Sequence, residues 1–280
     1  MDTIESTISK SGSASYLVPL QQFIFKFLVK SLIGADPSSS KEISESGYIM
    51  LDRWLALQIL PTVHIGKEVI GRGEAEFGLN QKECIHNLLF ILGFNAFGGF
   101  SVFLPSLVSA LVSDKTGLQE KIRKEVREKG GSTLSFDSVK EMPLVLSVVY
   151  ETLRLNPPVP LQYGRARKNF QLSSHDSVFD IKKGELLCGF QTLVMRDPKI
   201  FEEPESFKAD RFMNEKGSEL LSYLYWSNGP QTGSPTASNK QCAAKDYVVL
   251  TAALFVAYAF RRYDSITGDS SSITAVEKAK

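Results

Sequence analysis

The feature that most constrains this fold is an uncharged segment, because Cys84 to Ser113 contains no Asp, Glu, Lys or Arg. A segment of that length and apolar character can span a membrane as a helix. It also carries His86, Asn95 and Pro105, and polar side chains are costly in contact with lipid. A helix in the core of a globular protein accommodates them more easily. We therefore predict a buried central helix and keep a membrane anchor as the weaker alternative.

The composition is that of a globular protein without a strong charge. Of 280 residues, 43% are hydrophobic and 22% are charged, and the formal net charge is +1. This balance excludes a disordered chain and gives no electrostatic footprint for nucleic acid, so no nucleic-acid partner is expected. Cys84, Cys188 and Cys242 are isolated and form no zinc-type pair, which favours a reducing compartment. The first residues, MDTIES, resemble neither a signal peptide nor a transit peptide.

Periodicity and turn residues predict a mainly α chain with a minor β portion, in one domain. Further helices are expected over 16–34, 46–60, 117–131 and 244–262. Asp137 or Ser138 is expected to cap a helical region that ends at Leu155, before Pro157. Residues 165–190 alternate in short runs and predict a hairpin or small sheet. The charged, Gly-rich stretch 64–78 is interpreted as an abrupt joint between the segments on either side of it.

A long polar loop precedes Cys242. Between Trp226 and Cys242 only Ala237 is aliphatic, and structureless loops of this length are usually functional or disordered. Cys242 lies at the N-terminal edge of the predicted helix 244–262, where free backbone N–H groups stabilise a thiolate. Such a thiolate can act as a nucleophile or bind a soft metal. None of the three histidines that could serve as its base is near it in the sequence, and a plain buried thiol is the alternative.

A charged pair stands in an apolar setting further upstream. Glu151 and Arg154 are three residues apart, so they share one face of a helix and can pair. The flanking sequences LVLSVVY and LNPPVP are apolar, which predicts burial. Because buried charges need several partners, Arg211 in FKADRF is a candidate third member.

These features, in this order, resemble the cytochrome P-450 superfamily. Glu151 and Arg154 match its E-x-x-R pair, and Arg211 matches the arginine that completes this structural ion network. Cys242 matches its proximal haem thiolate.

The resemblance implies the C-terminal two-thirds of a cytochrome P-450 fold. Residues 1–280 would form a single partial haem-thiolate domain, with a haem-binding loop at 226–246. The implied cofactor is haem b, with Cys242 as the ligand of its iron and Lys240 as the local basic residue that binds the cofactor.

Three stretches resemble the plant branch of this superfamily that metabolises fatty-acid hydroperoxides: the expanded loop SNGPQT…NKQCAAKD, GFNAFGGFSVFLPSLV (93–108) and PPVPLQYGRARK (157–168). Oxygen-activating members use an acid and an alcohol on the central helix to deliver protons. Gly98 and Gly99 stand where that pair is expected. The resemblance therefore implies a substrate that is already oxidised, and no NADPH, reductase or other redox partner.

The resemblance also implies where the substrate is bound. Asn95 is the expected catalytic residue, because its amide can hydrogen-bond a fatty-acid hydroperoxide. The expected residues of an apolar substrate pocket are Phe94, Phe97, Phe100, Pro158 and Val159. In the alternative interpretation, Asn95 only satisfies backbone groups of a buried helix.

Within this branch three stretches look most like hydroperoxide lyases: SNGPQTGSPTASNKQCAAKD, LSSHDSVFDIKKGELLCGFQ and SGSASYLVPLQQFIFKFL. The implied reaction splits a 13-hydroperoxide of linolenic or linoleic acid into a six-carbon aldehyde and a twelve-carbon oxo-acid, in oxylipin biosynthesis. Allene oxide synthase of the same branch is the nearest alternative. The family implies a chloroplast location and is compatible with peripheral membrane association.

Members of the family extend further at the N-terminus. In addition, LALQILPTVHIG (55–66) runs almost directly into KEVIGRGEAEFG (67–78), without the segment that usually forms a lid over the substrate channel. We therefore expect a truncated gene product or splice form with an internal gap and impaired activity. A non-catalytic remnant is the remaining alternative.

Overall fold

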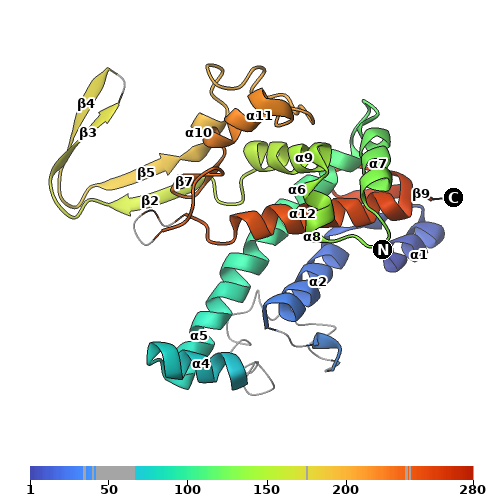
Figure 1. Cartoon of the computed structure of the whole chain (residues 1–280), viewed down its shortest axis with the longest axis horizontal. Helices are drawn as coiled ribbons and strands as arrows, with labels where there is room; N and C mark the ends of the chain where they lie inside the picture. The colour runs from blue at the N-terminus through green and yellow to red at the C-terminus, as the bar shows by residue number, and fades with distance from the viewer. Residues whose placement is uncertain are drawn as a thin grey trace. The chain divides into compact units, whose positions relative to one another are not determined.

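The structure, a computed structural model, is mainly helical with short strands, which confirms the predicted fold class (Figure 1). It describes residues 1–33, 36–39, 41, 67–174, 176–236, 239 and 241–279. The predicted helix over 46–60 lies outside them. The described chain divides into two compact units. Unit 1 consists of Met1–Lys124 and Ala259–Lys280, and unit 2 of Glu125–Tyr258.

Unit 1 brings residues from both ends of the chain into one small sheet. The elements are α1 (Asp2–Ser11), β1 (Ala14–Ser15), β8 (Tyr263–Gly268) and β9 (Ser272–Lys278). The strands are antiparallel in the order β1-β9-β8, and Ala14 pairs with Ile273. The turn after β8 requires glycine, because a Cβ on Gly268 would lie 2.2 Å from the carbonyl oxygen of Ser272. The sequence analysis predicts neither α1 nor these strands.

The other elements of unit 1 are helical. They are α2 (Leu17–Leu28), the π-helix η1 (Val29–Ile33), the short η2 (Pro37–Ser39), α4 (Lys67–Phe77), α5 (Gln81–Leu89), the π-helix η5 (Phe90–Gly98) and α6 (Gly99–Val112). The helix predicted over 16–34 corresponds to α2 and η1. The described part of the predicted joint over 64–78 belongs to the helix α4, on which Arg72 pairs with Glu76 at 2.8 Å.

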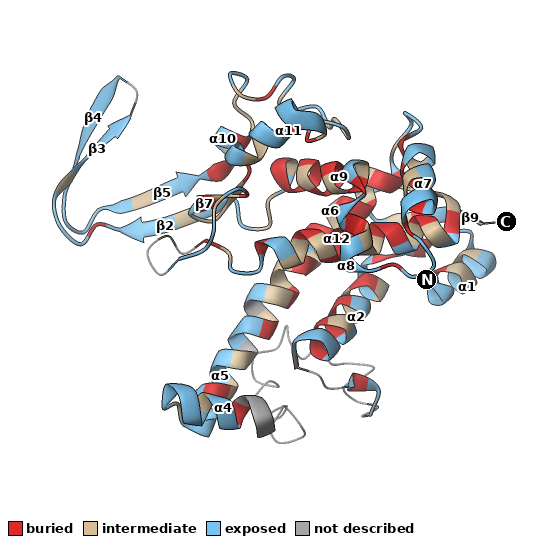
Figure 2. Cartoon of the chain, viewed as in Figure 1, coloured by how far each residue is buried: buried red, intermediate tan, exposed pale blue. Residues whose placement is uncertain are grey.

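The uncharged segment is helical from α5 to α6. Asn80 begins it with a capping box, in which Glu83 is the reciprocal partner. Burial is concentrated on α6, where Phe103 and Leu107 are completely buried, whereas Ile91 on η5 is 52% exposed (Figure 2). The helical run Gln81–Val112 is long and apolar enough to cross a membrane by length and composition. Core helices of soluble proteins meet the same two criteria, and α6 has the burial of a core helix.

Unit 2 contains the remaining helices. They are α8 (Phe136–Lys140), α9 (Pro143–Leu155), α10 (Gln191–Met195), α11 (Asn214–Leu220) and the short η6 (Leu221–Tyr223). Two helices, α7 (Leu118–Lys129) and α12 (Lys245–Arg262), each begin in one unit and end in the other. The predicted cap at Asp137 or Ser138 is wrong, because the Ser135 hydroxyl caps α8 and accepts from the Ser138 N–H at 3.2 Å.

A carboxylate from another helix caps α9. Glu125 on α7 accepts from the backbone N–H groups of Leu144 and Val145 at 3.1 and 2.9 Å. Pro143 stands at the first position of α9 and has no N–H to satisfy. The start of this apolar helix is therefore set by a residue that is distant in the sequence.

The strands of unit 2 form three two-stranded ladders. These are β2 (Leu161–Arg165) with β5 (Leu186–Phe190), β3 (Phe170–Ser174) with β4 (Ser177–Ile181), and β6 (Tyr225–Trp226) with β7 (Gly229–Pro230). The first two ladders follow one another as a ribbon, yellow in Figure 1, where a hairpin is predicted over 165–190. The third ladder leads into the polar loop and then into α12.

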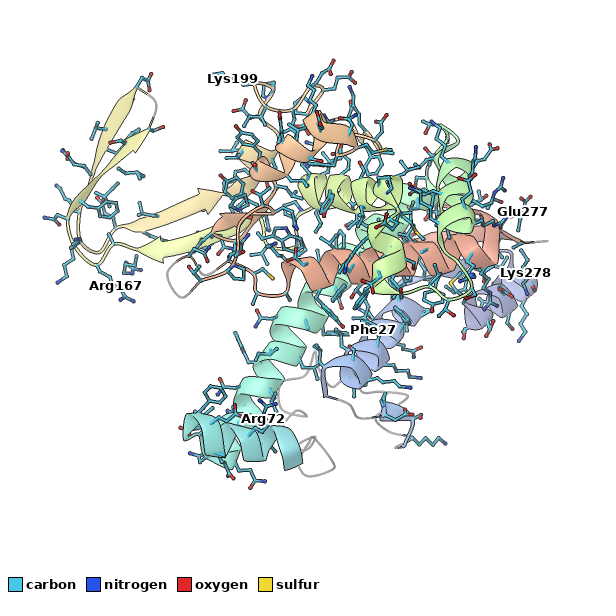
Figure 3. All side chains as sticks on the ribbon, in the orientation of Figure 1. Phe27, Arg72, Arg167, Lys199, Glu277 and Lys278 are labelled. Carbon is cyan, nitrogen blue, oxygen red and sulfur yellow. The ribbon has the colours of Figure 1, made fainter. Side chains whose placement is uncertain are left out.

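Glu5 joins α1 to the C-terminal sheet of unit 1. Its carboxylate accepts from Lys278 Nζ at 2.7 Å, from Arg262 at 2.8 Å and from the Tyr263 hydroxyl. Figure 3 labels Lys278 at the end of β9, beside α1. The hydrogen bond from Lys278 and then that from Tyr263 lower the pKa of Glu5 to about 2.

We predict that Glu5 makes stability depend on pH in the acid range. A carboxylate whose pKa is lowered by folding stabilises the protein above its ordinary pKa of 4.5, and this contribution is lost as the pH falls toward 2. Glu5→Gln is expected to lower the Tm at neutral pH and to flatten its pH dependence in that window, measured by thermal unfolding followed by circular dichroism.

The matched control is Glu277→Gln on β9, whose side chain makes no ion pair among the described residues. It is expected to leave both the Tm and its pH slope unchanged. An equal slope in Glu5→Gln and wild type would contradict the role of Glu5.

Candidate functional site

Cys242 lies between β7 and the start of α12, with its side chain partly buried. Burial raises the pKa of its thiol, while the backbone N–H of Ala244 and the charge of Lys245 act in the opposite direction. The sulfur therefore sits at a helix N-terminus, with a backbone donor and a cation nearby. This environment suits a single thiolate ligand once a metal ion supplies its own positive charge.

The residue before Cys242 packs into the β6–β7 hairpin. Gln241 is buried, and its Nε2 donates to the carbonyl oxygen of Pro230. Gly229 makes room for this side chain, because a Cβ there would lie 2.8 Å from Gln241 Cδ. Asn239 organises the loop from within, since its Oδ1 accepts from the N–H groups of Thr236 and Gln241. The loop is thus held by specific contacts on the side of Cys242.

The expected basic residue of the loop, Lys240, lies outside the described residues. Lys245 is a cation near Cys242 that the sequence analysis misses. It is only 6% exposed, and its Nζ pairs with Asp246 at 2.8 Å. A signal for it exists in the sequence, because Lys245 comes three residues after the cysteine and begins an apolar helix.

Glu151, Arg154 and Arg211 come together in unit 2. Arg154 Nε and Nη2 donate to the two carboxylate oxygens of Glu151 at 2.7 and 2.8 Å, with both side chains completely buried. Arg211 Nε donates to the same carboxylate at 3.0 Å, and so does the backbone N–H of Lys208 at 2.9 Å. The carboxylate therefore has four donors, which is what a buried charge requires.

Backbone groups complete this cluster. Arg154 Nη1 donates to the carbonyl oxygens of Met195 and Pro204 at 2.7 and 2.6 Å, and its guanidinium lies 5.0 Å from the centre of the Phe201 ring. The cluster joins α9 to the segment that runs from α10 to Arg211. Because it is closed to solvent, its role is to hold this part of the fold.

The expected substrate residues are divided between the two units. Asn95 is exposed on η5 and Phe97 and Phe100 are buried on η5 and α6, all in unit 1. Pro158 is half-buried and Val159 exposed in unit 2, the unit of Cys242. The side chain of Phe94 is outside the described part of the structure. That these residues form one pocket with Cys242 stays a prediction.

Two details of Asn95 bear on its proposed role. Asn95 is exposed, and within the described residues its side chain makes no hydrogen bond. It also stands in a π-helix, a conformation that occurs frequently at functional sites.

Among the described residues, no group of three or more His, Cys, Asp and Glu side chains could hold a metal ion.

Comparison of the sequence with known proteins identifies its family. Residues 110–232 match the family described as Cytochrome P450. The chain is 57% identical to a protein of Solanum lycopersicum named Fatty acid hydroperoxide lyase, chloroplastic, over 99% of the chain and 66% of that protein. It is 57% identical to a protein of Arabidopsis thaliana named Probable inactive linolenate hydroperoxide lyase, over 99% of the chain and 82% of that protein. Identity to Allene oxide synthase 2, chloroplastic, of Solanum lycopersicum is 37%.

The chain belongs to the cytochrome P450 family, in the branch that contains the hydroperoxide lyases and allene oxide synthases. It spans about two thirds of the length of the tomato lyase, 66%. The alignment extends over 316 residues and the chain has 280, so the lyases contain internal positions without a counterpart here. This agrees with the internal gap predicted from the sequence.

We predict that Glu151→Gln destabilises unit 2 by about 3–5 kcal/mol, because it leaves two guanidinium groups in a buried site without their counter-charge. Urea unfolding measures this loss. The control is Glu205→Gln, which removes the partner of Arg196 from an ion pair in which Glu205 is 68% exposed. An exposed pair contributes about 0–1 kcal/mol. Equal losses for the two variants would contradict a special role for the buried cluster.

Proposed function

We propose that this protein is a haem-thiolate lyase of fatty-acid hydroperoxides. The observation that carries the proposal is the 57% identity to proteins named as hydroperoxide lyases, over 99% of the chain. The proposed substrates are 13-hydroperoxides of linolenic and linoleic acid, and the products a six-carbon aldehyde and a twelve-carbon oxo-acid. Two of these relatives are named as chloroplastic, which supports a chloroplast location for this chain.

The residues around Cys242 fit a haem iron held by one thiolate. The sulfur is a soft ligand at a helix N-terminus, with a backbone N–H donor and Lys245 to offset its charge. Gln241 and Gly229 fix the chain immediately before it. Cys242 would hold the iron, and Lys240 would contact the cofactor from the loop. When bound, haem supplies the one-electron chemistry that cleaves a peroxide O–O bond.

The other proposed residues bind and orient the substrate. The Asn95 amide would donate a hydrogen bond to the hydroperoxide, and Phe94, Phe97, Phe100, Pro158 and Val159 would supply apolar walls. The central helix has no carboxylate between Cys84 and Ser113 that could deliver protons to dioxygen. The reaction therefore needs no NADPH and no reductase, because the substrate itself brings the oxidised oxygen atoms.

Two alternatives are supported by specific observations. The Arabidopsis relative of which the chain covers 82% is named a probable inactive lyase, which favours a protein without lyase activity. The 37% identity to allene oxide synthase keeps that activity as a product alternative. The next experiment distinguishes the lyase, the inactive protein and the allene oxide synthase.

We predict that the protein reconstituted with haem shows a Soret band that is absent in Cys242→Ser. Cys188→Ser is the control, because Cys188 is exposed on β5 and is not proposed to bind haem. The sample is then given the 13-hydroperoxide of linolenic acid, and the products are identified by mass spectrometry. A six-carbon aldehyde supports the lyase, ketols derived from an allene oxide support the synthase, and no turnover supports the inactive alternative. A Soret band of equal strength in Cys242→Ser would overturn the ligand assignment.

Asn95 has a separate test. Asn95→Ala is expected to reduce kcat by about tenfold, because one hydrogen bond to the reacting group is lost, without a change in the Soret band. Asn87→Ala is the control, since the Asn87 amide already donates to the carbonyl oxygen of Glu83 at 2.9 Å. Unchanged kinetics in Asn95→Ala would remove this residue from the catalytic site.

A further inference from the structure

A chain of side-chain hydrogen bonds lies at the base of the Cys242 loop. Trp226 Nε1 donates to Gln231 Oε1 at 2.5 Å, and Gln231 Nε2 donates to Asp246 Oδ1 at 2.9 Å. Gln231 is buried, with 8% of its surface exposed. Because an indole can only donate and a carboxylate can only accept, the amide of Gln231 has one orientation that satisfies both partners. We call these three residues the relay.

The relay closes the loop on which Cys242 stands. Trp226 ends β6, Gln231 directly follows β7, and Asp246 is in the first turn of α12. Gln231 is itself fixed, because its backbone N–H donates to the carbonyl oxygen of Leu224 at 2.7 Å. The relay therefore joins the residue where the loop begins to the helical turn that follows Cys242.

Asp246 is the charged member of the relay. Its carboxylate also accepts from Lys245 Nζ at 2.8 Å, and an acidic residue in a first helical turn is stabilised by the helix dipole. The hydrogen bond from Gln231 to this charged group is stronger than one between neutral groups. Gln241 provides the anchor before Cys242, and the relay provides the anchor after it.

We propose that Gln231 is a positioning residue that holds Cys242 in place for the cofactor, an inference that rests on the proposed function. A loop whose ends are fixed loses less conformational entropy when its cysteine binds a metal. Ligand residues held in one geometry by hydrogen-bonded neighbours bind metals more tightly. Gln231 touches neither the sulfur nor the substrate, so it acts through the chain on either side of the cysteine.

The experiment compares Gln231→Glu, Asp246→Asn and the double variant in a Cys188→Ser background. In Gln231→Glu two carboxylates face each other, and the loop is expected to separate from α12. In the double variant the carboxylate at position 231 accepts from Trp226 and from the new amide at position 246, so the relay is restored. Thr232→Ala is the matched control, because Thr232 is the next residue of the loop, is exposed and is not part of the relay.

Two readouts are used. In the haem-free protein, the rate at which iodoacetamide alkylates Cys242 is followed by peptide mass spectrometry. In a haem titration, the Kd and the position of the Soret band are recorded. We expect Gln231→Glu to accelerate alkylation about tenfold and to raise the haem Kd about tenfold, the effect of one charge-assisted hydrogen bond. The double variant is expected to return both values to within about threefold of the parent.

Three outcomes would overturn the positioning role: unchanged values in Gln231→Glu, no recovery in the double variant, or faster alkylation that only follows a fall in Tm. If the parent protein binds no haem, the proposed function fails, and the alkylation rates alone still decide whether Gln231 holds the cysteine.

Discussion

The buried carboxylate of Glu151 is the interaction on which unit 2 depends. Four donors reach it, from Arg154, Arg211 and the backbone N–H of Lys208, and its removal would leave both guanidinium groups without their counter-charge. The carbonyl oxygens that complete the Arg154 guanidinium come from Met195 and Pro204. The cluster thereby sets the path of the chain between α9 and the start of the polar loop. The position of the loop that carries Cys242 therefore depends on this cluster.

The described residues of the polar loop are held by hydrogen bonds of the same small polar residues that make its sequence look structureless. Asn239 bonds to Ser234, Thr236 and Gln241, so the turns of the loop are stabilised locally. Two glutamines attach it to the β6–β7 hairpin and to α12. Cys242 is therefore presented at a helix N-terminus next to a segment that these polar side chains hold in place.

Local patterns predicted much of this structure, and long-range contacts account for what they missed. The spacing of Glu151 and Arg154 follows from helix geometry, and the apolar flanks indicate their burial. The backbone carbonyls around Arg154, the Glu125 cap of α9 and the Gln231 relay depend on residues that are brought together only by the fold. β1 has two residues, too few to show a period. Asn95 and Cys242 lie in separate units, so their proposed cooperation is still a prediction from family resemblance.

The pairing of β1 with β9 has a consequence for how the chain is made. Unit 2 is one continuous segment, Glu125–Tyr258, and all its residues are synthesised before β9. The sheet of unit 1 needs both Ala14 and its partner Ile273, so the pairing of β1 can form only after β9 has been synthesised. The helix α2 does not share this delay, because it packs against η5 and α6, which come earlier in the chain than β9. β1 is therefore an unpaired strand edge until β9 has been made, and unpaired strand edges make incomplete chains prone to aggregation.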